Sequence, residues 1–269
     1  MRVLQLVTDP AGAELAADRL WLAGARAVEQ VTLTDGRVGL RTVLAGDDAV
    51  SMARLGSLPS GWTVEWVDVP DEPSEAWRDH VTPVAVADRV VLRPAWLPEL
   101  GDGRLEIAIE PGGSFGLGDH PTTRLSSAAV VRLTTPGCSV LDVGCGSGVL
   151  AILAARLGAA RAVGIDVSVA AVEATRDNAA RNRVADRVVA TSTPIGAVTD
   201  TYDLVVANVL APAIIAMAAD LRRVLAAGGV LVVSGVLARV HGHVVEALAP
   251  LRAVRTDVLD AWAAVELRG

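Results

Sequence analysis

The stretch from Val140 to Gly148, which reads VLDVGCGSG, decides the fold. Its first four residues predict a buried strand, and the glycines after them predict a tight turn that opens a helix. Glycines let backbone N–H groups and a helix N-terminus approach a ligand closely. A dinucleotide fingerprint would need a further glycine at position 149, which is Val149 here, so the match to that fingerprint fails.

An acidic residue, Asp166, ends the next apolar run, residues 161–165. A carboxylate at that place can accept hydrogen bonds from both hydroxyls of a ribose. The loop and Asp166 together favour S-adenosylmethionine over a nicotinamide cofactor. A dehydrogenase and a nucleotide-binding protein without activity remain alternatives. Asp166 and Asn208 also have a simpler interpretation, as caps of the helices that follow them.

From about residue 105 onward, apolar strands alternate with helices. Strands are expected at 139–143, 161–166, 187–191, 203–208 and 229–235, and helices near 121–133, 148–157, 168–182, 211–225 and 238–249. Near-continuous apolar strands are typical of a parallel sheet covered by helices on both faces. Residues 252–258 and 262–268 predict a closing hairpin. The expected fold class is α/β, a class I methyltransferase with a Rossmann-like doubly wound sheet and a C-terminal antiparallel hairpin.

The front of the chain follows another pattern. Strands are expected at 3–8, 27–33, 38–44 and 62–69, and helices at 11–24 and 47–55, which is the β-α-β-β-α-β order of a ferredoxin-like α+β domain. We therefore expect a ferredoxin-like substrate-recognition domain over 1–69 and a proline-rich linker over 70–104 that carries one strand at 89–92. The methyltransferase domain is expected over 105–269.

Composition narrows the class of protein further. The chain has 269 residues, 52% of them hydrophobic, and no uncharged apolar run reaches the ~18 residues of a membrane span. The N-terminus lacks the features of a signal peptide, so a cytoplasmic protein without a membrane partner is expected. Cys138 and Cys145 have no nearby histidine cluster and predict neither a disulfide framework nor a metal site.

Charge is uneven along the chain. Residues 1–110 carry 10 Arg against 18 Asp and Glu, whereas residues 111–269 carry 14 Arg against 13. An acidic front half argues against direct binding of nucleic acid, which favours a basic surface. It suits a basic protein partner, and it is equally consistent with a solvated surface that aids solubility.

Residues 110–123, which read EPGGSFGLGDHPTT, carry a resemblance to a known family. They resemble the FGTGxHPTT signature of the ribosomal protein methyltransferase A (PrmA) family, to which the electron-transfer-flavoprotein lysine methyltransferases are related. Residues 142–148, 164–166 and 205–211 fit the same family. The resemblance runs from about Trp77 to the C-terminus and implies methylation of amino groups of a basic ribosomal protein, L11, by a protein that is expected to be a monomer.

The resemblance also implies roles for individual residues. Thr123 would meet the cofactor at a helix start, Asp166 would hold its ribose, and Phe115 would belong to a flap over it. Asn208 would lie where the methyl group is delivered and is the candidate catalytic residue. The full set of candidate cofactor-binding residues is Phe115, Thr123, Gly144, Cys145, Gly146, Asp166 and Asn208.

Two positions depart from the family signature. Leu117 replaces a threonine between the glycines, and Asp119 adds a carboxylate before His120. These changes leave cofactor binding in place and bear on the acceptor, which could be another protein or a small molecule.

Overall fold

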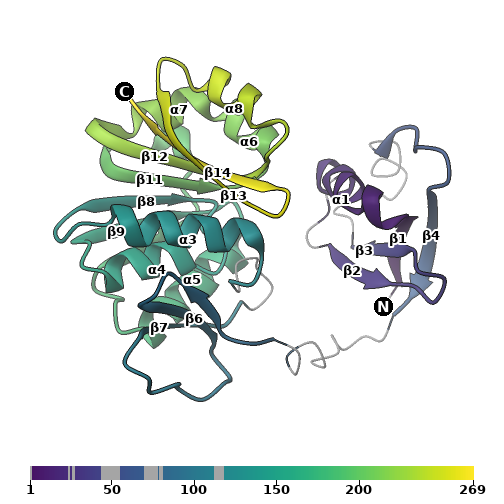
Figure 1. The fold of residues 1–269 in the computed structure, drawn as a ribbon, viewed down its shortest axis with the longest axis horizontal. Coiled ribbons are helices and arrows are strands. Elements are labelled where there is room, and N and C mark those ends of the chain that lie inside the picture. The colour runs from purple at the N-terminus through teal and green to yellow at the C-terminus, as the bar shows by residue number, and fades with distance from the viewer. Residues whose placement is uncertain are drawn as a thin grey trace. The chain divides into compact units, whose positions relative to one another are not determined.

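The computed structural model describes residues 2–23, 25, 28–43, 55–69, 78, 81–111 and 118–269. The chain divides into two compact units, residues 1–80 and residues 81–269. Figure 1 labels the helices and strands of the two units.

The first unit is a four-stranded antiparallel sheet with one described α-helix. Its elements are β1 Arg2–Thr8, the 3-10 helix Pro10–Gly12, α1 Ala13–Leu22, β2 Glu29–Thr32, β3 Val38–Thr42 and β4 Thr63–Asp68. The strand order is β2-β3-β1-β4, and Leu6, Leu20 and Leu40 form part of its core. Except for Leu55, the second expected helix, 47–55, lies outside the described residues, so the ferredoxin-like class of this unit stays a prediction.

The second unit is built on a seven-stranded sheet. Its strands are β8 Ser139–Val143, β9 Arg161–Ile165, β10 Val188–Thr191, β11 Tyr202–Asn208, β12 Leu225–Leu237, β13 Arg252–Leu259 and β14 Trp262–Arg268. The order is β10-β9-β8-β11-β12-β14-β13. The first five are parallel, and β14 runs antiparallel to both β12 and β13, which confirms the expected hairpin. Strand order reverses between β8 and β11, where open α/β sheets bind ligands.

Helices cover both faces of this sheet. They are α3 Pro121–Leu133, α4 Val149–Arg156, α5 Val169–Arg181, α6 Ala211–Ala216, α7 Ala218–Arg223 and α8 His241–Ala247. Successive strand residues alternate between two cores: Val140 packs in the cluster that includes residues of α3, α4 and α5, and Leu141 packs in the one with residues of α6, α7 and α8. This alternation confirms the doubly wound α/β class.

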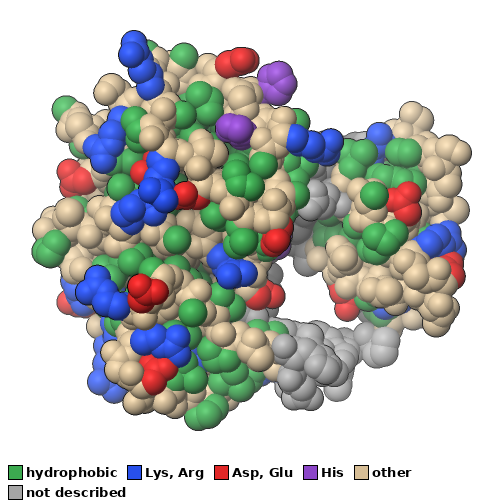
Figure 2. Space-filling model, in the orientation of Figure 1, with side chains coloured by type: hydrophobic (Ala, Val, Ile, Leu, Met, Phe, Trp, Pro, Cys, Tyr) green, Lys and Arg blue, Asp and Glu red, His purple; other side chains and the backbone are tan. Residues whose placement is uncertain are grey.

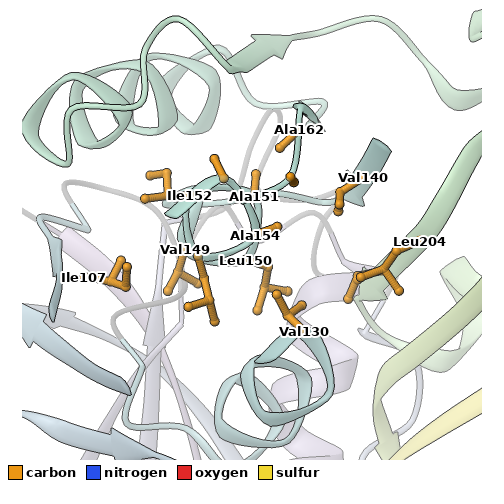
Figure 3. Close-up of a cluster of buried hydrophobic side chains, with 14 of the residues drawn as sticks. Ile107, Val130, Val140, Val149, Leu150, Ala151, Ile152, Ala154, Ala162 and Leu204 are labelled. Atoms are coloured by element: carbon orange, nitrogen blue, oxygen red, sulfur yellow. The ribbon is translucent and has the colours of Figure 1, made fainter. Parts of the chain in front are cut away.

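Helix α4 lies at the centre of the first core. Its residues from Val149 to Ala155 are all buried, and Figure 3 shows this helix between Ile107, Val130 and Leu204. Alanines at 151, 154 and 155 let neighbouring elements approach the helix closely. Because α4 is packed on all sides, the position where the glycine loop, residues 144–148, enters this helix is fixed.

Two expected helices differ from the structure. The single helix expected over 211–225 is two short helices that meet at Met217, whose φ of −93° and ψ of 4° interrupt the regular turn. Helix α8 begins at His241 and not near 238, because the Ala238 N–H donates to the Ala261 carbonyl at 2.8 Å and so belongs to the hairpin.

The expected linker over 70–104 also differs. Strands β5 Val84–Val86 and β6 Val90–Pro94 pair with each other, and β6 pairs with β7 Leu105–Ile109 in a three-stranded sheet of the second unit. The partly buried ion pair between Arg93 and Glu106, 2.7 Å, joins β6 to β7. Residues 81–104 therefore belong to the second unit. This proline-rich stretch contains two strands, β5 and β6, whereas the sequence predicted one. No helix in the described part of the chain is long and apolar enough to cross a membrane.

Candidate cofactor site at the carboxyl edge of the sheet

The glycine loop follows β8 directly. Gly144, Gly146 and Gly148 have φ values of 74°, 52° and 82°, which side chains rarely tolerate. A Cβ on Gly144 would lie 2.3 Å from Cγ1 of Val209, the residue after β11, so the loop backbone and Val209 approach each other as only glycine allows. The loop is thereby held at the switch point of the sheet.

Asp166 follows β9 and is tied to this loop. Its Oδ2 accepts the Gly146 N–H at 3.0 Å, and its Oδ1 accepts the Ser168 N–H at 2.9 Å. The N-cap of α5 is Ser168, whose Oγ accepts the Ala171 N–H, so capping of α5 is not the role of Asp166. The half-buried carboxylate keeps lone pairs for a ligand while the loop fixes its direction.

Asn208 is the last residue of β11. It is half-buried, and in register it lies beside Ser234 of β12. The N-cap of α6 is Leu210, and the Asn208 side chain makes no hydrogen bond to any other described residue. The ends of three adjacent strands thus carry Gly144, Asp166 and Asn208 along one edge.

Helix α3 brings Thr123 to this edge. His120 is its N-cap, and Nδ1 of the ring accepts the Thr122 N–H at 3.3 Å. Burial lowers the pKa of His120, which keeps the ring neutral and able to accept. Ser234 Oγ lies within hydrogen-bond distance of the Thr122 carbonyl, 3.4 Å, so the start of α3 adjoins the strand next to Asn208.

Thr123 itself is 1% exposed, and its hydroxyl has no hydrogen-bond partner in the described protein. A buried hydroxyl without a partner is costly, and Ser126 and Ser127 of the same helix share this state. Among the three, Thr123 lies nearest the start of α3, next to the carboxyl edge of the sheet. Phe115 and Leu117 lie outside the described residues, and Asp119 is exposed.

Cys145 is packed beneath the loop. The Thr175 hydroxyl oxygen lies 3.4 Å from its sulfur, and a Cβ on Gly164 would lie 3.0 Å from the same sulfur. Burial raises the pKa of this thiol to about 12, so it stays protonated. The side chain of Cys145 therefore supports the loop from behind, and Gly146 contributes through its N–H to Asp166.

Sequence reasoning did not single out Asp142, inside β8. It is 1% exposed, and burial raises the pKa of its carboxyl to about 7. Its Oδ2 accepts the Ala151 N–H of α4 at 3.2 Å, whereas Oδ1 has no partner in the described protein. The available signal was an acidic residue within an otherwise apolar strand.

Sequence reasoning also missed a polar stripe on α5. Thr175 Oγ1 donates to the Gly146 carbonyl at 3.1 Å, and Asn178 Nδ2 donates to the Ser147 carbonyl at 2.9 Å. Helix α5 thus holds two consecutive carbonyls of the glycine loop. Within the described chain, no cluster of three or more His, Cys, Asp or Glu side chains could hold a metal ion.

Comparisons with known proteins agree with this geometry. The family model described as ribosomal protein L11 methyltransferase (PrmA) matches residues 51–268. A ribosomal protein L11 methyltransferase of Symbiobacterium thermophilum is 39% identical over 251 residues, which cover 91% of this chain and 78% of that protein. One of Geobacter metallireducens is 43% identical over 173 residues, so the chain spans 56% of the length of that relative.

A solved structure gives the same result. The ribosomal protein L11 methylase of Lactobacillus delbrueckii subsp. bulgaricus superposes with a TM-score of 0.65 at 26% identity, over 70% of this chain and 98% of that one. The family model and the Symbiobacterium relative both extend over most of the sequence. The chain therefore belongs to the ribosomal protein L11 methyltransferase (PrmA) family.

Proposed function

We propose that this protein transfers methyl groups from S-adenosylmethionine to amino groups of ribosomal protein L11. The observation that carries the proposal is the edge where Gly144, Asp166 and Asn208 end adjacent strands, in a chain that belongs to a family named for this activity. We place the acceptor nitrogens on lysine side chains, the N-terminus, or both. We also propose a cytoplasmic location and a monomer.

The residues at this edge fit the cofactor. The unpartnered oxygen of Asp142 and the unpartnered hydroxyl of Thr123 are buried and await polar groups, which the amino acid part of the cofactor has. Asp166 suits the ribose, and the exposed Val167 beside it offers an apolar surface to the adenine ring. When bound, S-adenosylmethionine supplies a methyl group on a positively charged sulfur.

The protein then has to present a neutral amine in line with that methyl group. A free lysine amine has a pKa of about 10.4, so most of it is protonated at neutral pH. Burial in a poorly solvated site lowers this pKa and releases the proton. The side-chain oxygen of Asn208, which has no other described partner, can accept a hydrogen bond from the amine and aim its lone pair.

Charge supports a basic acceptor. Residues 1–80, the first unit, carry 13 acidic residues against 7 arginines, and we propose that this unit recognises the substrate. On the face shown in Figure 2, acidic and basic side chains of the second unit are interspersed, with no extended patch of one sign. Long-range attraction of a basic protein would therefore come from the front of the chain.

The proposal is tested with purified protein, labelled S-adenosylmethionine and purified L11. We expect label on L11, and mass spectrometry of its peptides identifies the modified amines. An Asp166→Ala variant serves as the negative control. Labelling of another protein in a lysate, with none on L11, would support a different acceptor. Thermal stabilisation by NAD and not by S-adenosylmethionine would contradict the proposed chemistry altogether.

A further inference from the structure

One face of α5 carries a buried polar stripe of three residues. Thr175 and Asn178 lie in α5 and Asn182 is its C-cap, and their spacings of three and four place them on the same side of the helix. All three are at most 3% exposed. The stripe lies between the glycine loop and the outer edge of β7, and it joins the two.

The amide of Asn178 is fully used. Its Oδ1 accepts the Glu110 N–H at 2.9 Å and an Arg181 Nη1 hydrogen at 2.6 Å. Its Nδ2 donates to the Glu110 carbonyl at 2.8 Å and to the Ser147 carbonyl at 2.9 Å. Two partners can only donate and two can only accept, so a single orientation of the amide satisfies all four.

Asn182 makes a similar pair with β7 but does not reach the loop. It accepts the Ala108 N–H at 2.9 Å and donates to the Ala108 carbonyl at 2.7 Å. Its remaining bond goes to the Asn178 carbonyl within α5. The two asparagines therefore match in residue type, burial and strand partner, and they differ in the contact of Asn178 with Ser147.

We propose that Asn178 is a positioning residue of the cofactor site, which holds the glycine loop in register with the end of β7. Because the peptide group is planar, fixing the Gly146 and Ser147 carbonyls against α5 also fixes the N–H groups of Ser147 and Gly148, and the Gly148 N–H closes the loop by donating to the Cys145 carbonyl at 2.7 Å. Thr175 holds the first carbonyl and Asn178 the second. The same amide fixes Glu110, so one side chain sets the distance between loop and strand. The inference rests on the proposed cofactor.

The test compares wild type, Asn178→Ala, Asn178→Ser and Asn182→Ala. Titration calorimetry with S-adenosylhomocysteine measures binding, and thermal unfolding measures stability. We expect both alanine variants to unfold at similarly reduced temperatures, since each removes two side-chain hydrogen bonds to the backbone at the carboxyl end of β7. The Kd should rise about tenfold or more in the Asn178 variants and stay within about twofold of wild type in Asn182→Ala.

Kinetics separates positioning from a general loss of structure. In the methyl-transfer assay, the KM for S-adenosylmethionine should rise in the Asn178 variants while kcat at saturating cofactor changes little. The reason is that the cofactor loses the same binding energy in the ground state and in the transition state. Asn178→Ser provides the same readouts in a variant that keeps a small polar group in the space.

The outcomes are distinct. If wild type does not bind S-adenosylhomocysteine, the proposed function itself fails. If wild type binds and the Asn178 variants bind equally well, the inference fails and the proposed function stands. An equal loss of affinity in Asn182→Ala and Asn178→Ala would also overturn the inference, since the contact with Ser147 would then be irrelevant.

Discussion

The paired strands β8 and β11 have an aspartate toward each end, and the two aspartates differ in their hydrogen bonds and in their pKa. At the amino end, Asp203 accepts the Ser139 N–H at 2.8 Å and its hydroxyl at 2.7 Å, and the Ser139 hydroxyl accepts the Asp203 N–H at 3.1 Å. These bonds hold the pKa of Asp203 below its usual value. At the carboxyl end, Asp142 keeps one oxygen unpaired, and burial raises its pKa to about 7.

The difference separates structural from functional polar groups. The amino end is closed by bonds within the protein and needs nothing from outside. The carboxyl end leaves an oxygen of Asp142 and the hydroxyl of Thr123 buried and without a partner in the described chain, and the half-buried Asn208 ends β11 at the same edge. A buried polar group without a partner costs free energy, and a ligand bound at this edge would offer partners to both groups. The hydroxyls of Ser126 and Ser127, further along α3, also lack partners in the described chain, so it is the position at the strand ends that links Asp142 and Thr123 to a ligand.

The largest effect is expected at Asp166. Replacing it with alanine removes the group proposed to bind both ribose hydroxyls, and two hydrogen bonds to a charged group correspond to about a thousandfold in affinity. Calorimetric titration with S-adenosylhomocysteine measures the change. A Kd within a factor of about three of wild type would mean that the ribose lies elsewhere.

Asn208→Ala tests the catalytic role at the same edge. We expect kcat for methyl transfer to fall about a hundredfold, because the amine loses the group that aims it. The affinity for S-adenosylhomocysteine should change far less, since the proposed contact is made mainly with the acceptor. Equal losses in turnover and in cofactor binding would contradict the positioning role.

Asp142→Asn tests the raised pKa of this carboxyl through the pH dependence of the free energy of unfolding. The carboxyl of Asp142 has a usual pKa of 3.8 and a raised pKa of about 7 in the folded protein. At pH values between these two, it holds a proton in the folded chain and not in the unfolded chain. The stability of wild type relative to the asparagine variant should therefore fall by about 2 kcal/mol as pH rises from 5 to 7. Urea unfolding of both proteins across this range measures it, and parallel curves would refute the raised pKa.

The smallest effect is expected at the closed end. Asp203→Ala should lower the free energy of unfolding by roughly 1 kcal/mol, because the carboxylate is exposed and its bonds to Ser139 compete with water. Its lowered pKa means that this contribution is present above pH 4 and is lost as pH falls through the folded pKa. The affinity for S-adenosylhomocysteine should not change. A higher Kd would show that the amino end also affects the cofactor site and would contradict the contrast between the two ends.

The parts of this fold that sequence predicts are those with local signals. Five parallel strands and the hairpin follow from apolar runs and turn residues, and Asp166 and Asn208 follow from their places at strand ends. Asn178 could not be found this way. On an amphipathic helix it resembles a solvated residue, and its partner Glu110 is 68 positions away in the sequence. The burial of Asp142 is likewise set by α4, which packs over β8.

Asn178 and Asn182 also cover the edge of the three-stranded sheet, which is strand β7. Four residues of a helix advance by about 6 Å and two residues of a strand by about 6.6 Å, so Asn178 and Asn182 meet Glu110 and Ala108 as a neighbouring strand would. Helix α5 thereby occupies the open flank of β7, which would otherwise be able to recruit a foreign chain. Insertion of one residue between the two asparagines would rotate one of them by about 100° and expose that flank to aggregation.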